Sequence, residues 1–67
     1  MIRENLKTIR ESRGYSKSEL ARKSGVNKRT IEYIEYGKTL HPRLDILLKL
    51  STTLEVNVID LIQTKEG

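Results

Sequence analysis

The chain lacks cysteine, tryptophan and phenylalanine, and it contains one proline and one methionine among its 67 residues. Without cysteine it can form no disulfide, no thiolate nucleophile and no cysteine-ligated zinc site. Its longest apolar stretches, such as 46–48, fall far short of the ~18 residues that a membrane-spanning helix needs. No secretory apolar region follows Met1. We therefore expect a cytoplasmic protein with no membrane association.

The length and the charge distribution indicate a small folded domain with one basic face. Apolar residues make up 36% of the chain and charged residues 33%, which is typical of a folded domain rather than a disordered chain. Residues 1–43 hold eleven Lys and Arg against five Asp and Glu, whereas residues 44–67 hold two against four. A basic front half suggests a polyanionic partner. The alternative is that these side chains are only the solvated faces of helices, and charge alone does not decide between the two.

The apolar spacing and the capping residues predict five helices and no strand, an all-α class. The first helix covers residues 2–13, and the next two cover about 17–24 and 28–36. Residues 38–42 form a loop in which Pro42 suits the start of a fourth helix, and the leucines from Leu44 to Leu54 give that helix a broad apolar face. A short fifth helix follows Asn57. We predict helix caps at Ser16 for the second helix, at Asn27 for the third and at Asn57 for the fifth.

The segment 17–36 has the features of a helix-turn-helix. Two helices joined by so short a connection need a small residue where they cross, which Ala21 supplies, and a left-handed turn position, which Gly25 supplies. Val26, Ile31 and Ile34 can then hold the second helix against the first. An ordinary helical hairpin without a ligand is the alternative. The outward side chains of the second helix are Lys28, Arg29, Glu32, Tyr33 and Tyr36.

On these residues the chain resembles the lambdoid phage repressor and Cro family, also called the xenobiotic-response-element type. The resemblance covers residues 6–62. It implies a single five-helix domain over 1–67 that binds operator DNA as a dimer, with its third helix in the major groove. The residues that carry it are Leu6, Ile9, Arg10, Gly14, Tyr15, Ser16, Glu19, Leu20, Ala21, Gly25, Val26, Thr30, Ile31, Ile34, Glu35, Gly37, Lys38, Pro42, Leu44, Leu47, Leu48, Leu50, Val56, Asn57 and Val58.

The resemblance also implies roles for individual residues. Lys28 and Arg29 stand where family members read base edges, and Arg43 stands where an arginine approaches the minor groove. Glu32 has the chemistry to accept a hydrogen bond from cytosine N4, but its spacing favours pairing with Lys28 or Arg29. The predicted DNA-binding residues are Ser16, Lys17, Lys28, Arg29, Glu32, Tyr33, Tyr36, Lys38 and Arg43.

Two further pairs of residues are expected to support this site. Arg10 and Glu35 match an ion pair that bridges the first and third helices, and we interpret them as structural. Ile59 and Ile62 are not both needed to hold the last helix down, because Val58 and Leu61 can do so. Spare apolar groups on a terminal helix are typical of an interface. We therefore predict that Ile59 and Ile62 form a homodimer interface.

No enzyme, metal or cofactor site is predicted. His41 is the single histidine, and it lies beside a proline with no cysteine to join it as a ligand, while the serines have no spaced acid to complete a triad. No small-molecule ligand is evident either. We predict a sequence-specific transcriptional regulator, a repressor that binds a palindromic operator. The alternatives are an antitoxin or a restriction-modification control protein of the same fold, or a protein-interaction adaptor without DNA binding.

Overall fold

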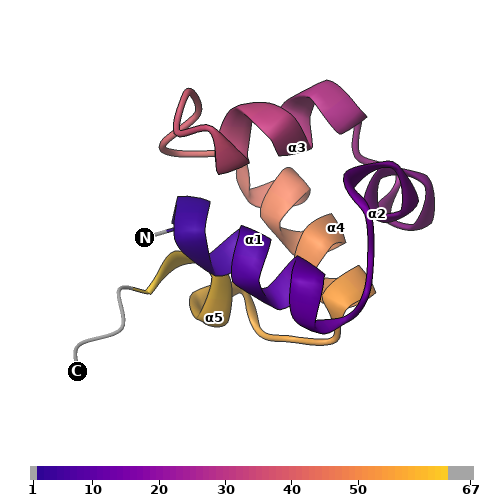
Figure 1. Ribbon diagram of the computed structural model, residues 1–67. Coiled ribbons are helices and arrows are strands. Elements are labelled where there is room, and N and C mark those ends of the chain that lie inside the picture. Colours follow the sequence, from indigo (N-terminus) through magenta and orange to yellow (C-terminus); the bar gives the residue numbers. More distant parts are fainter. Residues whose placement is uncertain (1, 64–67) are drawn as a thin grey trace.

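A computed structural model describes residues 2–63, which fold into five α-helices (Figure 1). The helices are α1 (Ile2–Ser12), α2 (Lys17–Ser24), α3 (Lys28–Glu35), α4 (Leu44–Leu54) and α5 (Val58–Ile62). No strand occurs among the described residues, so the predicted all-α class is confirmed. None of these helices is long and apolar enough to cross a membrane. Of the predicted domain 1–67, residues 1 and 64–67 lie outside the described residues.

The arrangement leaves α3 at one edge of the bundle. α1 packs against both α3 and α5, which lie on opposite sides of it, and α2 packs against α3 and α4 (Figure 1). No helix lies over the outward face of α3 (Figure 1). Lys28, Arg29 and Tyr33 of α3 are exposed on that face.

Three predicted boundaries need correction. α1 ends at Ser12 rather than at residue 13, and α3 ends at Glu35 rather than at residue 36, because in each case the chain leaves the helix in a turn. The N–H of Arg13 is shared between the carbonyls of Ile9 and Arg10, which tightens the end of α1. Pro42 does not start α4. The helix begins two residues later because the backbone of Arg43, its N-cap, is still extended.

The predicted caps of α2 and α3 are confirmed. The hydroxyl of Ser16 accepts a hydrogen bond from the N–H of Glu19 at 3.1 Å, and the Glu19 carboxylate accepts one from the N–H of Ser16 at 3.0 Å. This backbone hydrogen bond from Ser16 is the main reason that the pKa of Glu19 lies below its usual value. The side chain of Asn27 accepts from the N–H of Arg29 at 2.8 Å. These local bonds fix where both motif helices begin.

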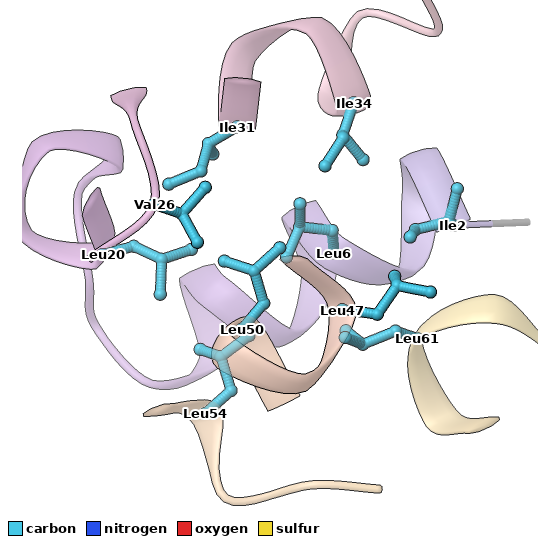
Figure 2. Close-up of a cluster of buried hydrophobic side chains, with 10 residues drawn as sticks. All are labelled: Ile2, Leu6, Leu20, Val26, Ile31, Ile34, Leu47, Leu50, Leu54 and Leu61. Carbon is cyan, nitrogen blue, oxygen red and sulfur yellow. The ribbon is translucent and has the colours of Figure 1, made fainter. Parts of the chain in front are cut away.

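The core is formed by apolar side chains that all five helices contribute (Figure 2). Leu20, Val26 and Ile31 meet where α2, the turn and α3 converge, which is the packing that the helix-turn-helix prediction required. The buried apolar residues are Ile2, Leu6, Leu20, Val26, Ile31, Ile34, Leu47, Leu50, Leu54 and Leu61.

The apolar face of α4 is narrower than predicted. Leu44 and Leu48 were expected to belong to it, but they are 63% and 49% exposed. The reason is that α2 and α5 contact α4 along one stripe, which holds Leu47, Leu50 and Leu54. Leu44 and Leu48 lie beside this stripe and have no helix over them.

A buried ion pair joins α1 to α3, as predicted. The Nε of Arg10 donates to Oε2 of Glu35 at 2.7 Å, and its Nη2 donates to Oε1 at 3.0 Å. The two side chains are only 8% and 2% exposed. The Nη1 of Arg10 also donates to the carbonyl of Tyr15 at 2.8 Å, and so it holds the chain that leads into α2. The bidentate geometry fixes the orientation of α3 on the core.

Two other side chains, Asn5 of α1 and Arg13 just after it, hold distant parts of the chain. The Nε of Arg13 donates to the carbonyl of Leu54 at 2.8 Å, at the end of α4. The side-chain amide of Asn5 donates to the carbonyls of Leu61 and Gln63, at 3.0 and 2.6 Å. These bonds satisfy carbonyls at helix ends that have no partner within their own helix. Neither bond was foreseen from the sequence.

The turn of the helix-turn-helix depends on Gly25, whose φ of +77° lies in the left-handed region. A Cβ at this position would meet no atom within 4 Å, so a larger residue would be opposed by the backbone conformation alone. We expect Gly25→Val to lower the free energy of unfolding by about 1–2 kcal/mol in chemical denaturation. Gly25→Asn is the control, and it should cost less because asparagine tolerates this conformation. An unchanged free energy of unfolding for Gly25→Val would mean that the left-handed turn is not required.

Candidate nucleic-acid interface

The outward face of α3 forms a shallow, open hollow. Four of the predicted DNA-binding residues meet there, and two residues that were not predicted as part of the site join them. The lining residues are Asn27, Lys28, Arg29, Thr30, Glu32 and Tyr33. Asn27 was identified only as a cap, and Thr30 only as a residue of the family resemblance. The position of Asn27 at the N-cap and of Thr30 in the first turn of α3 was the available signal.

The first turn of α3 carries two cations and no acid. Lys28 and Arg29 are both exposed. A helix N-terminus bears partial positive charge, so acidic residues stabilise it and basic residues do not. The two side chains therefore do not serve the stability of α3. Together with the backbone N–H groups they make this end of the helix attractive to anions.

The start of α2 is joined to the end of α3 by Lys17 and Tyr36. The Nζ of Lys17 donates a hydrogen bond to the Tyr36 hydroxyl at 3.0 Å and lies 4.7 Å from the centre of its ring. This hydrogen bond is the main reason that the pKa of Lys17 is raised. The contact holds the two motif helices together at the protein surface. It was not predicted, because the two residues are distant in the sequence.

The turn after α3 folds back on Tyr33. The N–H groups of Lys38 and Thr39 both donate to the carbonyl of Tyr33, at 2.8 and 3.1 Å. The Nζ of Lys38 lies 5.4 Å from the centre of the Tyr33 ring, within the range of a cation–π interaction. Lys38 is thereby brought next to the hollow, beside an aromatic ring that is 40% exposed.

The structure contradicts the expected pairing of Glu32. Its carboxylate forms no hydrogen bond and no ion pair with Lys28 or Arg29 among residues 2–63. Helical spacing brings such residues near one another, but flexible side chains at a surface gain little from pairing. Glu32 is half-buried and lines the hollow.

Ser16 and Arg43 lie apart from the hollow. Ser16 caps α2, where its oxygen accepts a bond from Glu19 while its hydroxyl hydrogen remains available. Arg43 precedes α4, and its side chain is 83% exposed, with Nη2 at 3.2 Å from the Asp45 carboxylate. An ion pair this exposed is weak and easily exchanged for another anion. His41 is also exposed, and no group of three or more possible metal ligands forms among the described residues.

The side of the molecule opposite α3 carries exposed apolar groups. Ile59 and Ile62 of α5 are 55% and 47% exposed. Val58 and Leu61, in contrast, face the core, and Leu61 is fully buried. Exposed isoleucines on so short a helix leave apolar surface in water without contributing to the core.

Comparisons with known proteins agree with this geometry. A family model described as helix-turn-helix matches residues 6–61. The HTH-type transcriptional regulator SinR of Bacillus licheniformis is 39% identical over 66 residues, which are 98% of this chain and 60% of that protein. The chain thus spans about three fifths of the length of this relative.

Two solved structures are also similar. The N-terminal DNA-binding domain of SinR from Bacillus subtilis superposes with a TM-score of 0.93 at 39% identity, covering 100% of this chain and 97% of that one. SinR described as the master regulator for biofilm formation, in a crystal structure with DNA, gives a TM-score of 0.90 at 40% identity. That match covers 94% of this chain and 100% of the other.

Proposed function

The chain belongs to the Cro/C1-type helix-turn-helix family of transcriptional regulators, and from this membership we propose that it binds duplex DNA sequence-specifically and represses transcription. The observation that carries the proposal is the first turn of α3. Lys28 and Arg29 stand there exposed, at a helix end that basic side chains do not stabilise. A polyanion would supply the negative charge that the first turn of α3 lacks.

The hollow on α3 fits the edges of bases in the major groove, which is wide enough to admit one helix. Arg29 can donate two parallel hydrogen bonds to guanine O6 and N7, and Lys28 can make the same contact less rigidly. Tyr33 offers a ring for a thymine methyl group or a hydroxyl for a phosphate. These side chains come from one helix, so they would follow successive base pairs.

The residues around the hollow fit the phosphate backbone. Lys17 and Tyr36 hold each other at the junction of α2 and α3, and both retain capacity for an additional hydrogen bond. Phosphate contacts of this kind set the register of a protein on DNA without reading its sequence. The remaining backbone contacts in this proposal are made by Ser16, Lys38 and Arg43, with Arg43 reaching towards the minor groove.

Selection of bound duplexes from a random DNA library tests the proposal. We expect enrichment of one sequence that reads as an inverted repeat, with half-sites about one helical turn, or ~34 Å, apart. Occupancy of such a site would then repress by excluding other proteins. Recovery of a pool without sequence enrichment would contradict specific binding. Enrichment of a single half-site would support sequence-specific binding but contradict the palindromic operator.

The homodimer is tested by a charge on α5. In this proposal Ile59 and Ile62 meet their counterparts across a two-fold axis, which places two α3 helices in adjacent major grooves. Ile59→Asp should shift the protein towards monomer in sedimentation and weaken operator binding, because a carboxylate in an apolar contact loses its hydration. Helicity should be retained, since Ile59 is exposed.

Leu48→Asp is the matched control, because Leu48 is 49% exposed on a different helix. If Leu48→Asp dissociates the dimer and Ile59→Asp does not, the interface lies on α4. A wild-type protein that sediments as a monomer both free and on its operator would rule out the homodimer.

A further inference from the structure

Glu32 is the single acidic side chain on the outward face of α3. It lies among the cations of the hollow, yet among residues 2–63 its carboxylate has no hydrogen bond and no ion pair. Lys28 and Arg29 are one helical turn before it and form no ion pair with it. Its charge contributes least to the raised pKa of Lys17, after the hydrogen bond to Tyr36 and the charge of Glu35. The charge is therefore still available to a ligand.

A carboxylate in this position opposes DNA binding unless the DNA supplies a donor. It is repelled by the phosphates, and it loses hydration when α3 enters the major groove. Guanine presents two acceptors in that groove and thymine presents one acceptor and a methyl group, so neither can satisfy a carboxylate. Adenine offers an amino group with the acceptor N7 beside it. Cytosine offers the N4 amino group and no acceptor of its own.

On this basis we propose that Glu32 is a specificity-determining residue that accepts a hydrogen bond from the N4 amino group of one cytosine in each half-site. The inference rests on the proposed function and names the base that this position selects. Glu32 would act in two ways. It increases affinity for duplexes with a cytosine at one position, and it lowers affinity for duplexes that present an acceptor there. Selectivity would thus come partly from repulsion of wrong sites.

The position of Glu32 relative to Arg29 fits this role. Glu32 is three positions after Arg29, which corresponds to about 4.5 Å along the helix axis. One base-pair step is ~3.4 Å. If Arg29 contacts a guanine, Glu32 comes opposite the next base pair along the groove. Arg29, which only donates hydrogen bonds, would then contact a guanine. Glu32, which only accepts them, would contact a cytosine in the neighbouring base pair.

The test uses the duplex selected by the wild-type protein and a set in which each cytosine in turn is replaced by an analogue without the 4-amino group. Affinities are measured by fluorescence anisotropy for wild type, Glu32→Ala and Glu11→Ala. Glu11 is exposed on α1, so Glu11→Ala removes the same charge outside the hollow. Glu32→Ala should fold normally, because the carboxylate forms no bond within the described residues.

We expect one analogue position per half-site to weaken wild-type binding on the order of tenfold. Glu32→Ala should show almost no change at that position, and it should bind scrambled duplex more tightly than wild type does. Glu11→Ala should keep the full sensitivity of wild type. The inference is overturned if Glu32→Ala retains that sensitivity, or if it tightens binding to every duplex equally. A wild-type protein that prefers no sequence would overturn the proposed function as well, so the two failures are distinguishable.

Discussion

Glu35→Ala should destabilise the domain by about 3–5 kcal/mol, because it leaves the guanidinium of Arg10 buried without its partner. In the native protein the hydrogen bond to Glu35 raises the pKa of Arg10. Without Glu35 the guanidinium still cannot lose its proton, so the variant holds a buried, unpaired charge. A chain of 67 residues has a total stability of roughly 3–10 kcal/mol. The variant should therefore lose a large share of its stability, as measured by urea denaturation followed by circular dichroism.

Two further variants distinguish the effect of breaking the buried ion pair from the effect of removing any single charge. Glu11→Ala removes a carboxylate that lies 4.0 Å from Arg10 but is 58% exposed, and it should change stability by less than ~1 kcal/mol. The double variant Arg10→Met with Glu35→Leu replaces both charges with apolar groups and should recover most of the stability. If Glu35→Ala proves as mild as Glu11→Ala, the ion pair does not hold α3 on the core.

Arg29→Ala should weaken binding to the best DNA site by ~1–3 kcal/mol, with the effect confined to one base pair per half-site. The side chain stands in the first turn of α3, where base edges come within reach. Arg43→Ala should instead weaken binding to all sequences similarly. It should also make the salt dependence less steep, by about one unit of slope for each phosphate that the variant no longer neutralises. Affinities for the selected site and for a scrambled duplex at several salt concentrations measure both effects.

Lys49→Ala is the matched control for these two arginine variants. Lys49 is an exposed cation on α4 outside the proposed contacts, so its removal tests the influence of net charge alone. Equal weakening on the selected and scrambled duplexes for Arg29→Ala would make Arg29 a phosphate contact. A change of specificity in Arg43→Ala would mean that Arg43 reads a base.

The parts of the fold that depend on neighbouring residues could be predicted from the sequence. Ser16 and Glu19 satisfy each other across three residues, and Asn27 caps the very next turn, so both motif helices begin where the sequence indicates. Gly25 takes the left-handed conformation that so short a turn demands. The ion pair of Arg10 with Glu35 spans 25 residues, and it was predicted only through the family resemblance.

The parts that depend on packing between helices could not be predicted. Periodicity shows that α4 has apolar residues on one side, but the width of its buried stripe depends on where α2 and α5 cross it. Leu44 and Leu48 fall outside that stripe for this reason. The contact between Lys17 and Tyr36 requires the final angle between two helices. Glu32 has suitable spacing for two partners and pairs with neither in the described residues, because spacing permits an exposed ion pair without favouring it strongly.

The bonds from Asn5 to the carbonyls of Leu61 and Gln63 have a consequence for the order of folding. They join residues 56 and 58 positions apart, so almost the whole chain must be closed before they can form. A helix of five residues does not persist alone in water. We therefore expect α5 to fold last and to open first in local fluctuations of the native state. If Ile59 and Ile62 meet a second copy, association stabilises this late-folding end, and the fraction of time that it is folded rises with protein concentration.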